Sequence, residues 1–150
     1  MMNTPSTFFG FAALMLAAGV GIPIMAALNS QLGARIDSPW AASAMLFVVG
    51  GVVAAIVLAI NGLPKAPFSA PPQFYAGGFL VAFYALSITW AAPKMGVGNA
   101  IFFVLLGQIA AACTIDHFGL FGAAKSVMTV QRAAGVALMI AGVFLARRVT

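Results

Sequence analysis

Long stretches without a charged residue are the feature that most restricts how this chain can fold. Only 6% of its 150 residues are charged and 63% are hydrophobic, whereas about 25% of the residues in a soluble domain are charged. The charged residues separate apolar runs long enough to cross a bilayer, as loops do in multi-span membrane proteins; they are Arg35, Asp37, Lys65, Lys94, Asp116, Lys125, Arg132, Arg147 and Arg148. The sequence therefore predicts an all-α membrane protein, with a bundle of transmembrane helices forming one domain over residues 1–150.

The charge balance and the scarcity of reactive side chains exclude several classes of function. A net charge of +5 would suggest a nucleic-acid partner in a soluble protein. Here no basic cluster with interleaved aromatic residues occurs, so the charge indicates loops held at the anionic headgroups of a lipid bilayer. One cysteine, one histidine and two acidic residues do not suffice for a catalytic triad or a His/Cys metal cluster. We therefore expect no enzyme, no metal, no cofactor and no nucleic-acid partner.

The apolar runs place the membrane spans. About 20 apolar residues cross a bilayer core, and such segments cover residues 8–32, 39–60, 74–92, 97–115 and 127–146. Pro39 suits a first helical turn, and Pro93 is predicted to stop the third span before a tight turn. The fifth segment spans only if it starts near Val127 and Arg132 extends its charged end to the interface. Five spans is the prediction, and four is the alternative.

Polar side chains inside the first and third spans are candidate contacts for a small solute. Tyr84, Ser87 and Trp90 follow at three-residue steps and therefore share one helix face. Trp90 also fits an anchor at the membrane interface. Asn29 fits helix packing better than a solute site. Pro23 removes a backbone hydrogen bond from the first span, which predicts a helix break: either a plain kink or a bend that exposes backbone groups to substrate.

The fourth span carries a second polar group. Gln108 lies near the middle of this span, where an amide facing lipid is costly, so it either lines a solute site or bonds a neighbouring helix. Asp116 lies at the end of the span. An interfacial ion pair with Arg132 explains it better than a proton-carrying carboxylate does, and His117 is also predicted at the interface.

Several segments together resemble a known family. They are "NSQLGARIDSPWAASAMLFVVGG", "FYAGGFLVAFYALSITWAAPKMGV", "LLGQIAAACTIDHFGLFG" and "QRAAGVALMIAGVFL". They are similar to the YdcZ-type bacterial inner-membrane proteins, short five-helix members of the drug/metabolite transporter superfamily. The most specific part is Gly107–Gln108 followed by residues 116–119, "DHFG". One position departs from the pattern, because family members often carry a glutamine where this chain has Met25.

The resemblance implies a half-sized unit of the ten-helix transporters, whose two five-helix halves face opposite ways. We therefore expect an exporter-like transporter of a small solute in the bacterial inner membrane, working as an antiparallel homodimer by alternating access. Tyr84, Ser87 and Gln108 would supply polar contacts in its cavity, with Trp90 and Asn29 at the rim. The alternative is a non-transporting membrane subunit or a passive pore, in which these groups only hold helices together.

The positive residues also predict dual topology. With five spans, three of the seven Lys and Arg residues fall on the amino-terminal face and four on the opposite face. Because the Lys/Arg excess of short loops sets orientation, a difference of one should fix neither orientation.

Overall fold

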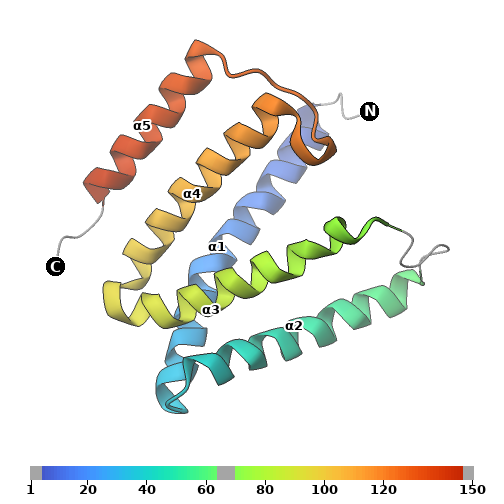
Figure 1. Ribbon diagram of the computed structural model, residues 1–150, viewed down its shortest axis with the longest axis vertical. Helices are drawn as coiled ribbons and strands as arrows, with labels where there is room; N and C mark the ends of the chain where they lie inside the picture. The colour runs from blue at the N-terminus through green and yellow to red at the C-terminus, as the bar shows by residue number, and fades with distance from the viewer. Residues whose placement is uncertain (1–4, 64–69, 147–150) are drawn as a thin grey trace. The chain divides into compact units, whose positions relative to one another are not determined.

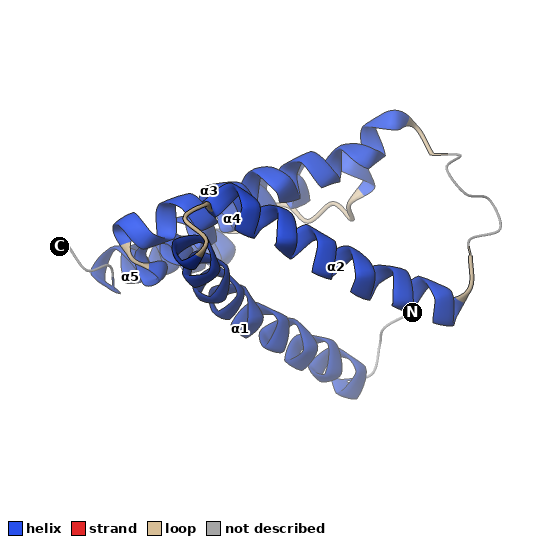
Figure 2. Ribbon diagram, turned by 90° about the horizontal axis from the view of Figure 1, so that it is seen from below, coloured by secondary structure: helices blue, strands red, loops and turns tan. Residues whose placement is uncertain are grey.

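The described part of the chain is helical, as the sequence predicts. In a computed structural model, residues 5–63 and 70–146 are described, and within them there are five α-helices, two short 3-10 helices and no strand (Figures 1 and 2). Lys65, Arg147 and Arg148, which enter the topology prediction, lie outside these ranges.

Four helical segments in the described ranges are long and apolar enough to cross a membrane. They are α1 (Pro5–Arg35), α2 (Pro39–Asn61), η1 with α3 (Pro72–Ala76 and Gly77–Met95) and α4 (Val97–Phe118). Large apolar side chains such as Phe8, Val48 and Phe79 are exposed along them. Water would oppose this exposure, whereas lipid chains solvate such surfaces, so the helices are suited to a bilayer.

The fifth helix is shorter than the other four. Helix α5 (Val130–Ala146) has 17 residues, which gives a length of about 26 Å at 1.5 Å per residue, against a bilayer core of about 30 Å. The predicted segment began near Val127, but residues 127–129 are not helical. A full crossing by α5 stays a prediction.

Two prolines lie inside helices. The prediction that Pro93 stops the third span is wrong, because α3 continues to Met95. A proline inside a helix removes its own hydrogen bond and its ring clashes with the carbonyl four residues earlier, which can bend the helix without ending it. The helix instead ends before Gly96, whose φ of 86° lies in the left-handed region that glycine adopts readily. Helix α1 also continues through Pro23, so no break in the helix occurs there, and a bend toward a cavity stays a prediction.

The chain divides into two compact units, residues 1–94 and 95–150. In the first unit, α1 and α2 pack against each other beside the turn that joins them. Gly33 allows this approach, since a Cβ there would lie 3.2 Å from the Cα of Pro39. Ser38 then caps α2 by accepting a hydrogen bond from the Ala41 N–H at 3.2 Å. Helix α2 begins at Pro39, a position that proline favours.

In the second unit, α4 and α5 contact each other and lie side by side (Figure 1). Gly119, in the left-handed region at φ 66°, ends α4, and the 3-10 helix η2 (Leu120–Gly122) follows. The Ser126 N–H donates to the Asp116 carbonyl at 2.8 Å. This bond holds the connecting segment against the end of α4.

Candidate functional site

A buried set of hydrogen bonds joins the three helices of the first unit. We call Asn29, Ser43 and Thr89 the polar junction; their exposed fractions are 5%, 0% and 1%. The Asn29 amide on α1 donates to the Thr89 hydroxyl on α3, which donates to the Ala85 carbonyl at 2.7 Å. The Ser43 hydroxyl on α2 lies 3.0 Å from the Pro39 carbonyl and 3.5 Å from the Ala85 carbonyl. Hydrogen bonds between membrane helices contribute about 0.6 kcal/mol each on average, so the junction stabilises this arrangement of helices.

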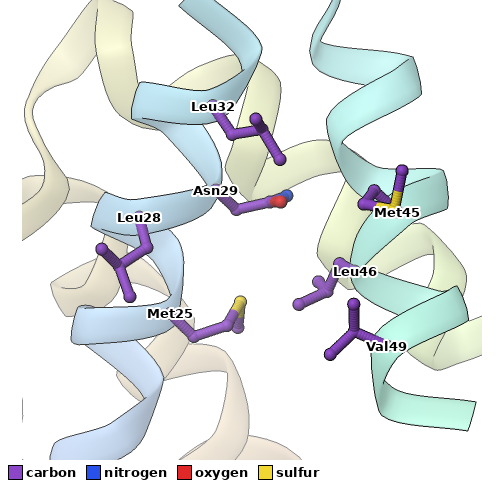
Figure 3. Close-up of a pocket in the computed structure, with 7 residues that line it drawn as sticks. All are labelled: Met25, Leu28, Asn29, Leu32, Met45, Leu46 and Val49. Carbon is purple, nitrogen blue, oxygen red and sulfur yellow. The ribbon is translucent and has the colours of Figure 1, made fainter. Parts of the chain in front are cut away.

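Asn29 also faces an apolar groove between α1 and α2. The groove has a volume of about 270 Å³ and is lined by Met25, Leu28, Asn29, Leu32, Met45, Leu46 and Val49. Figure 3 shows the Asn29 side chain extending from α1 into the space that faces α2, with Met45, Leu46 and Val49 on the opposite side. An apolar wall with a single polar group is typical of sites that orient a small ligand.

The three candidates on α3 lie in different surroundings. Tyr84 and Ser87 are half-buried, whereas Trp90 is exposed. The Tyr84 hydroxyl is buried and makes no hydrogen bond within residues 5–63 and 70–146. The Lys94 ammonium lies 3.5 Å from the centroid of the Trp90 ring, an arrangement that suits a tryptophan and a lysine at a membrane interface.

Thr89 is a site residue that the sequence did not identify. A threonine in a membrane helix commonly bonds the carbonyl four residues earlier and then needs no other partner. Thr89 makes that bond to Ala85 and also accepts the amide of Asn29. No periodicity links residues 29 and 89, so the sequence held no signal for this contact.

Gln108 lies on α4 in the second unit. Its side chain is exposed, and no hydrogen bond to it is observed in the part of the chain that the structure describes. In lipid, an amide without a partner is costly. The face of α4 that carries Gln108 is therefore suited to contact with protein, solute or water rather than with acyl chains.

Asp116, His117 and Arg132 form a cluster where α4 and α5 are joined. The Arg132 guanidinium lies 2.9 Å from the Asp116 carboxylate, with side-chain exposures of 43% and 38%. The guanidinium also donates to the Ser126 hydroxyl at 2.6 Å. His117 Nδ1 accepts the Met128 N–H at 3.1 Å, so its proton sits on Nε2 when the ring is neutral. Each of the three side chains thus has a partner that helps to hold the connection between α4 and α5.

No metal centre is found in the described ranges, because no three His, Cys, Asp or Glu residues there gather closely enough to hold an ion.

Comparison with known protein families identifies the chain over most of its length. A family model described as "Putative inner membrane exporter, YdcZ" matches residues 10–145, which is nearly the whole chain. No curated protein and no solved structure matches.

Proposed function

Because this chain belongs to the YdcZ family of inner membrane exporters, we propose that it exports a small solute as an antiparallel homodimer by alternating access. The family and the four apolar helices identify a multi-pass protein of the inner membrane. They favour a transporter over an enzyme. In this proposal residues 1–150 act as one transmembrane domain.

The observation that carries the proposal is the position of Asn29. Its amide nitrogen donates to Thr89 on α3, while its side chain also lines the groove between α1 and α2. An amide has donors and an acceptor, so a solute in the groove can bond the same side chain that links α1 to α3. Binding would then shift the balance between helix arrangements, as alternating access requires.

The dimer is supported by the exposed amide of Gln108, for which no hydrogen bond is observed within the described residues, and by the number of helices. Gln108 is exposed at the middle of α4, where contact with lipid alone would be unfavourable. A second, inverted copy could cover this face. Two inverted copies of a five-helix chain also form the inverted repeat on which many transporters rely. Tyr84, Ser87 and Gln108 are then the proposed polar contacts of the shared cavity, with Asn29 and Trp90 at its rim and Pro23 bending α1 toward it.

A solute-depletion experiment tests export directly. Vesicles containing the purified protein are loaded with a mixture of metabolites and cationic drugs, and mass spectrometry follows the loss of each solute. We expect one solute, or a few chemically similar solutes, to leave the vesicles that contain the protein faster than they leave protein-free vesicles. The variant Asn29→Leu should abolish most of this loss, because Asn29 carries the one polar side chain among the seven described residues that line the groove.

The matched control is Asn61→Leu, since the Asn61 amide is exposed and, within the described residues, donates to the Val57 carbonyl of its own helix. This variant should export at the rate of the unaltered protein. Loss of every small solute at comparable rates would instead indicate a passive pore, and loss of none would indicate a non-transporting subunit.

A further inference from the structure

A second cavity of the first unit lies where α1 and α3 end. We call it the turn pocket. It has a volume of about 310 Å³, and residues from α1, the following turn, the start of α2 and α3 line it, among them Ser30, Asp37, Trp90 and Lys94. Among the residues that line it, Trp90 belongs to the export site proposed above and Thr89 to the polar junction, whereas Ser30, Asp37 and Lys94 belong to neither.

Two opposite charges line the turn pocket without pairing with each other. In the described ranges the only ion pair is that of Asp116 with Arg132, although Asp37 and Lys94 line the same cavity. The Lys94 ammonium lies over the Trp90 ring. A cation–π contact uses the ring face and leaves ammonium hydrogens available to an acceptor. The pocket thus offers one acceptor and one donor of charge-assisted hydrogen bonds, with room between them.

A buried hydroxyl in the same lining lacks a partner. Ser30 is only 8% exposed, and its Oγ is buried with no hydrogen bond to any part of the chain that the structure describes. An unsatisfied buried hydroxyl is unfavourable. A polar ligand in the pocket would give it a partner.

We propose that the turn pocket binds a small zwitterion, a molecule that carries both a primary ammonium and a carboxylate or phosphate. The ammonium would donate to the Asp37 carboxylate. The anionic group would accept from Lys94 and from the Ser30 hydroxyl. Lys94 would repel a ligand that carries only a positive charge, and Asp37 would repel one that carries only a negative charge. Each would therefore lose part of the affinity that it gains from the opposite charge. A free amino acid and the phosphoethanolamine headgroup of a lipid share this chemistry. A role for this pocket in the export route rests on the proposed function, whereas the binding of a zwitterion to it does not.

Binding to the delipidated, detergent-purified protein tests the site without any transport. The probes are ω-amino acids of increasing chain length, with butylamine and butyrate as single-charge controls, and equilibrium dialysis gives the affinities. We expect one chain length to bind best and both controls to bind about tenfold more weakly, the effect of losing one charge-assisted hydrogen bond. Because this comparison uses the unaltered protein, it needs no variant to fold.

Variants then assign the contacts. Asp37→Asn and Lys94→Gln should each weaken binding of the best ω-amino acid about tenfold, and Ser30→Ala should weaken it less. Asn suits position 37 because the φ of 51° there lies in the left-handed region, which Asn tolerates. Arg35→Gln is the matched control, a nearby cation that does not line the pocket, and it should bind as the unaltered protein does.

An experiment in lipid nanodiscs distinguishes a free amino acid from a lipid headgroup as the source of the zwitterion. If a headgroup is the occupant, nanodiscs of phosphatidylethanolamine should raise the melting temperature above that in phosphatidylglycerol, and Asp37→Asn and Lys94→Gln should remove this difference. The inference is overturned if neither the ω-amino acids nor this lipid is preferred, if a single-charge control binds as tightly, or if both variants behave as the unaltered protein. If these binding tests fail while the vesicles still lose a solute, the zwitterion site is rejected and the export proposal stands. If the pocket binds zwitterions while the vesicles lose no solute, the export proposal is rejected and the zwitterion site stands.

Discussion

Replacing Gln108 with alanine is expected to lower the initial rate of solute efflux about tenfold, the effect of losing one hydrogen bond of about 1.4 kcal/mol. The melting temperature of the purified protein should change little. The reason is that Gln108 is exposed on α4 and makes no observed hydrogen bond within the described ranges that the substitution could break. Efflux from vesicles and thermal unfolding of the same preparations measure the two quantities.

Asp116→Asn is the matched comparison, with the opposite expected result. It removes the charge that pairs with Arg132 at 2.9 Å, and so weakens the link between α4 and α5. Since both side chains are partly exposed, the loss of stability should be at most about 1 kcal/mol. The efflux rate of the folded protein should stay near that of the unaltered chain. The assignment is wrong if Asp116→Asn stops efflux without loss of stability while Gln108→Ala unfolds the protein.

A second large effect is expected from charges added to one face. Lys65, Lys125 and Arg132 fall on the amino-terminal face of a five-span chain, and the opposite face carries Arg35, Lys94, Arg147 and Arg148. Because a difference of one positive residue should hold neither orientation, two carboxy-terminal reporters, one active inside the cell and one outside, should both give signal. Adding two lysines to either face should collapse this mixture to a single orientation.

The control for this experiment is a pair of glutamines at the same two positions, which should leave both signals unchanged. Signal from a single reporter at native expression would show a fixed topology and would contradict an antiparallel dimer.

Composition and hydropathy predicted the helices because lipid imposes a simple requirement. An apolar run of sufficient length must become a helix so that its backbone groups bond one another, and α1 to α4 follow from this. The start of α2 at Pro39 was also predictable, because proline suits a first turn. The end of α3 was not. Local signals favoured Pro93, but the backbone leaves the helix only at Gly96, whose φ of 86° sequence alone does not reveal.

The contacts between helices were harder to predict than the helices themselves. The bond of Asn29 to Thr89 joins residues sixty positions apart, and nothing local in the sequence selects one partner for a buried amide. The turn pocket depends likewise on how the turn after α1 places Asp37 beside the end of α3. The pairing of Asp116 with Arg132 was easier to anticipate, because few charged residues lie near that connection.

Counterflow tests alternating access most directly. Vesicles containing the protein are preloaded with a high concentration of the solute that the depletion experiment identifies, and are then diluted into a trace of the same solute carrying a radioactive label. A carrier that alternates between two faces returns with labelled solute while unlabelled solute leaves. We therefore predict that label rises transiently inside the vesicles above its outside concentration and that Asn29→Leu abolishes the rise. Label that approaches the outside concentration without ever exceeding it would contradict the account and indicate a passive pore.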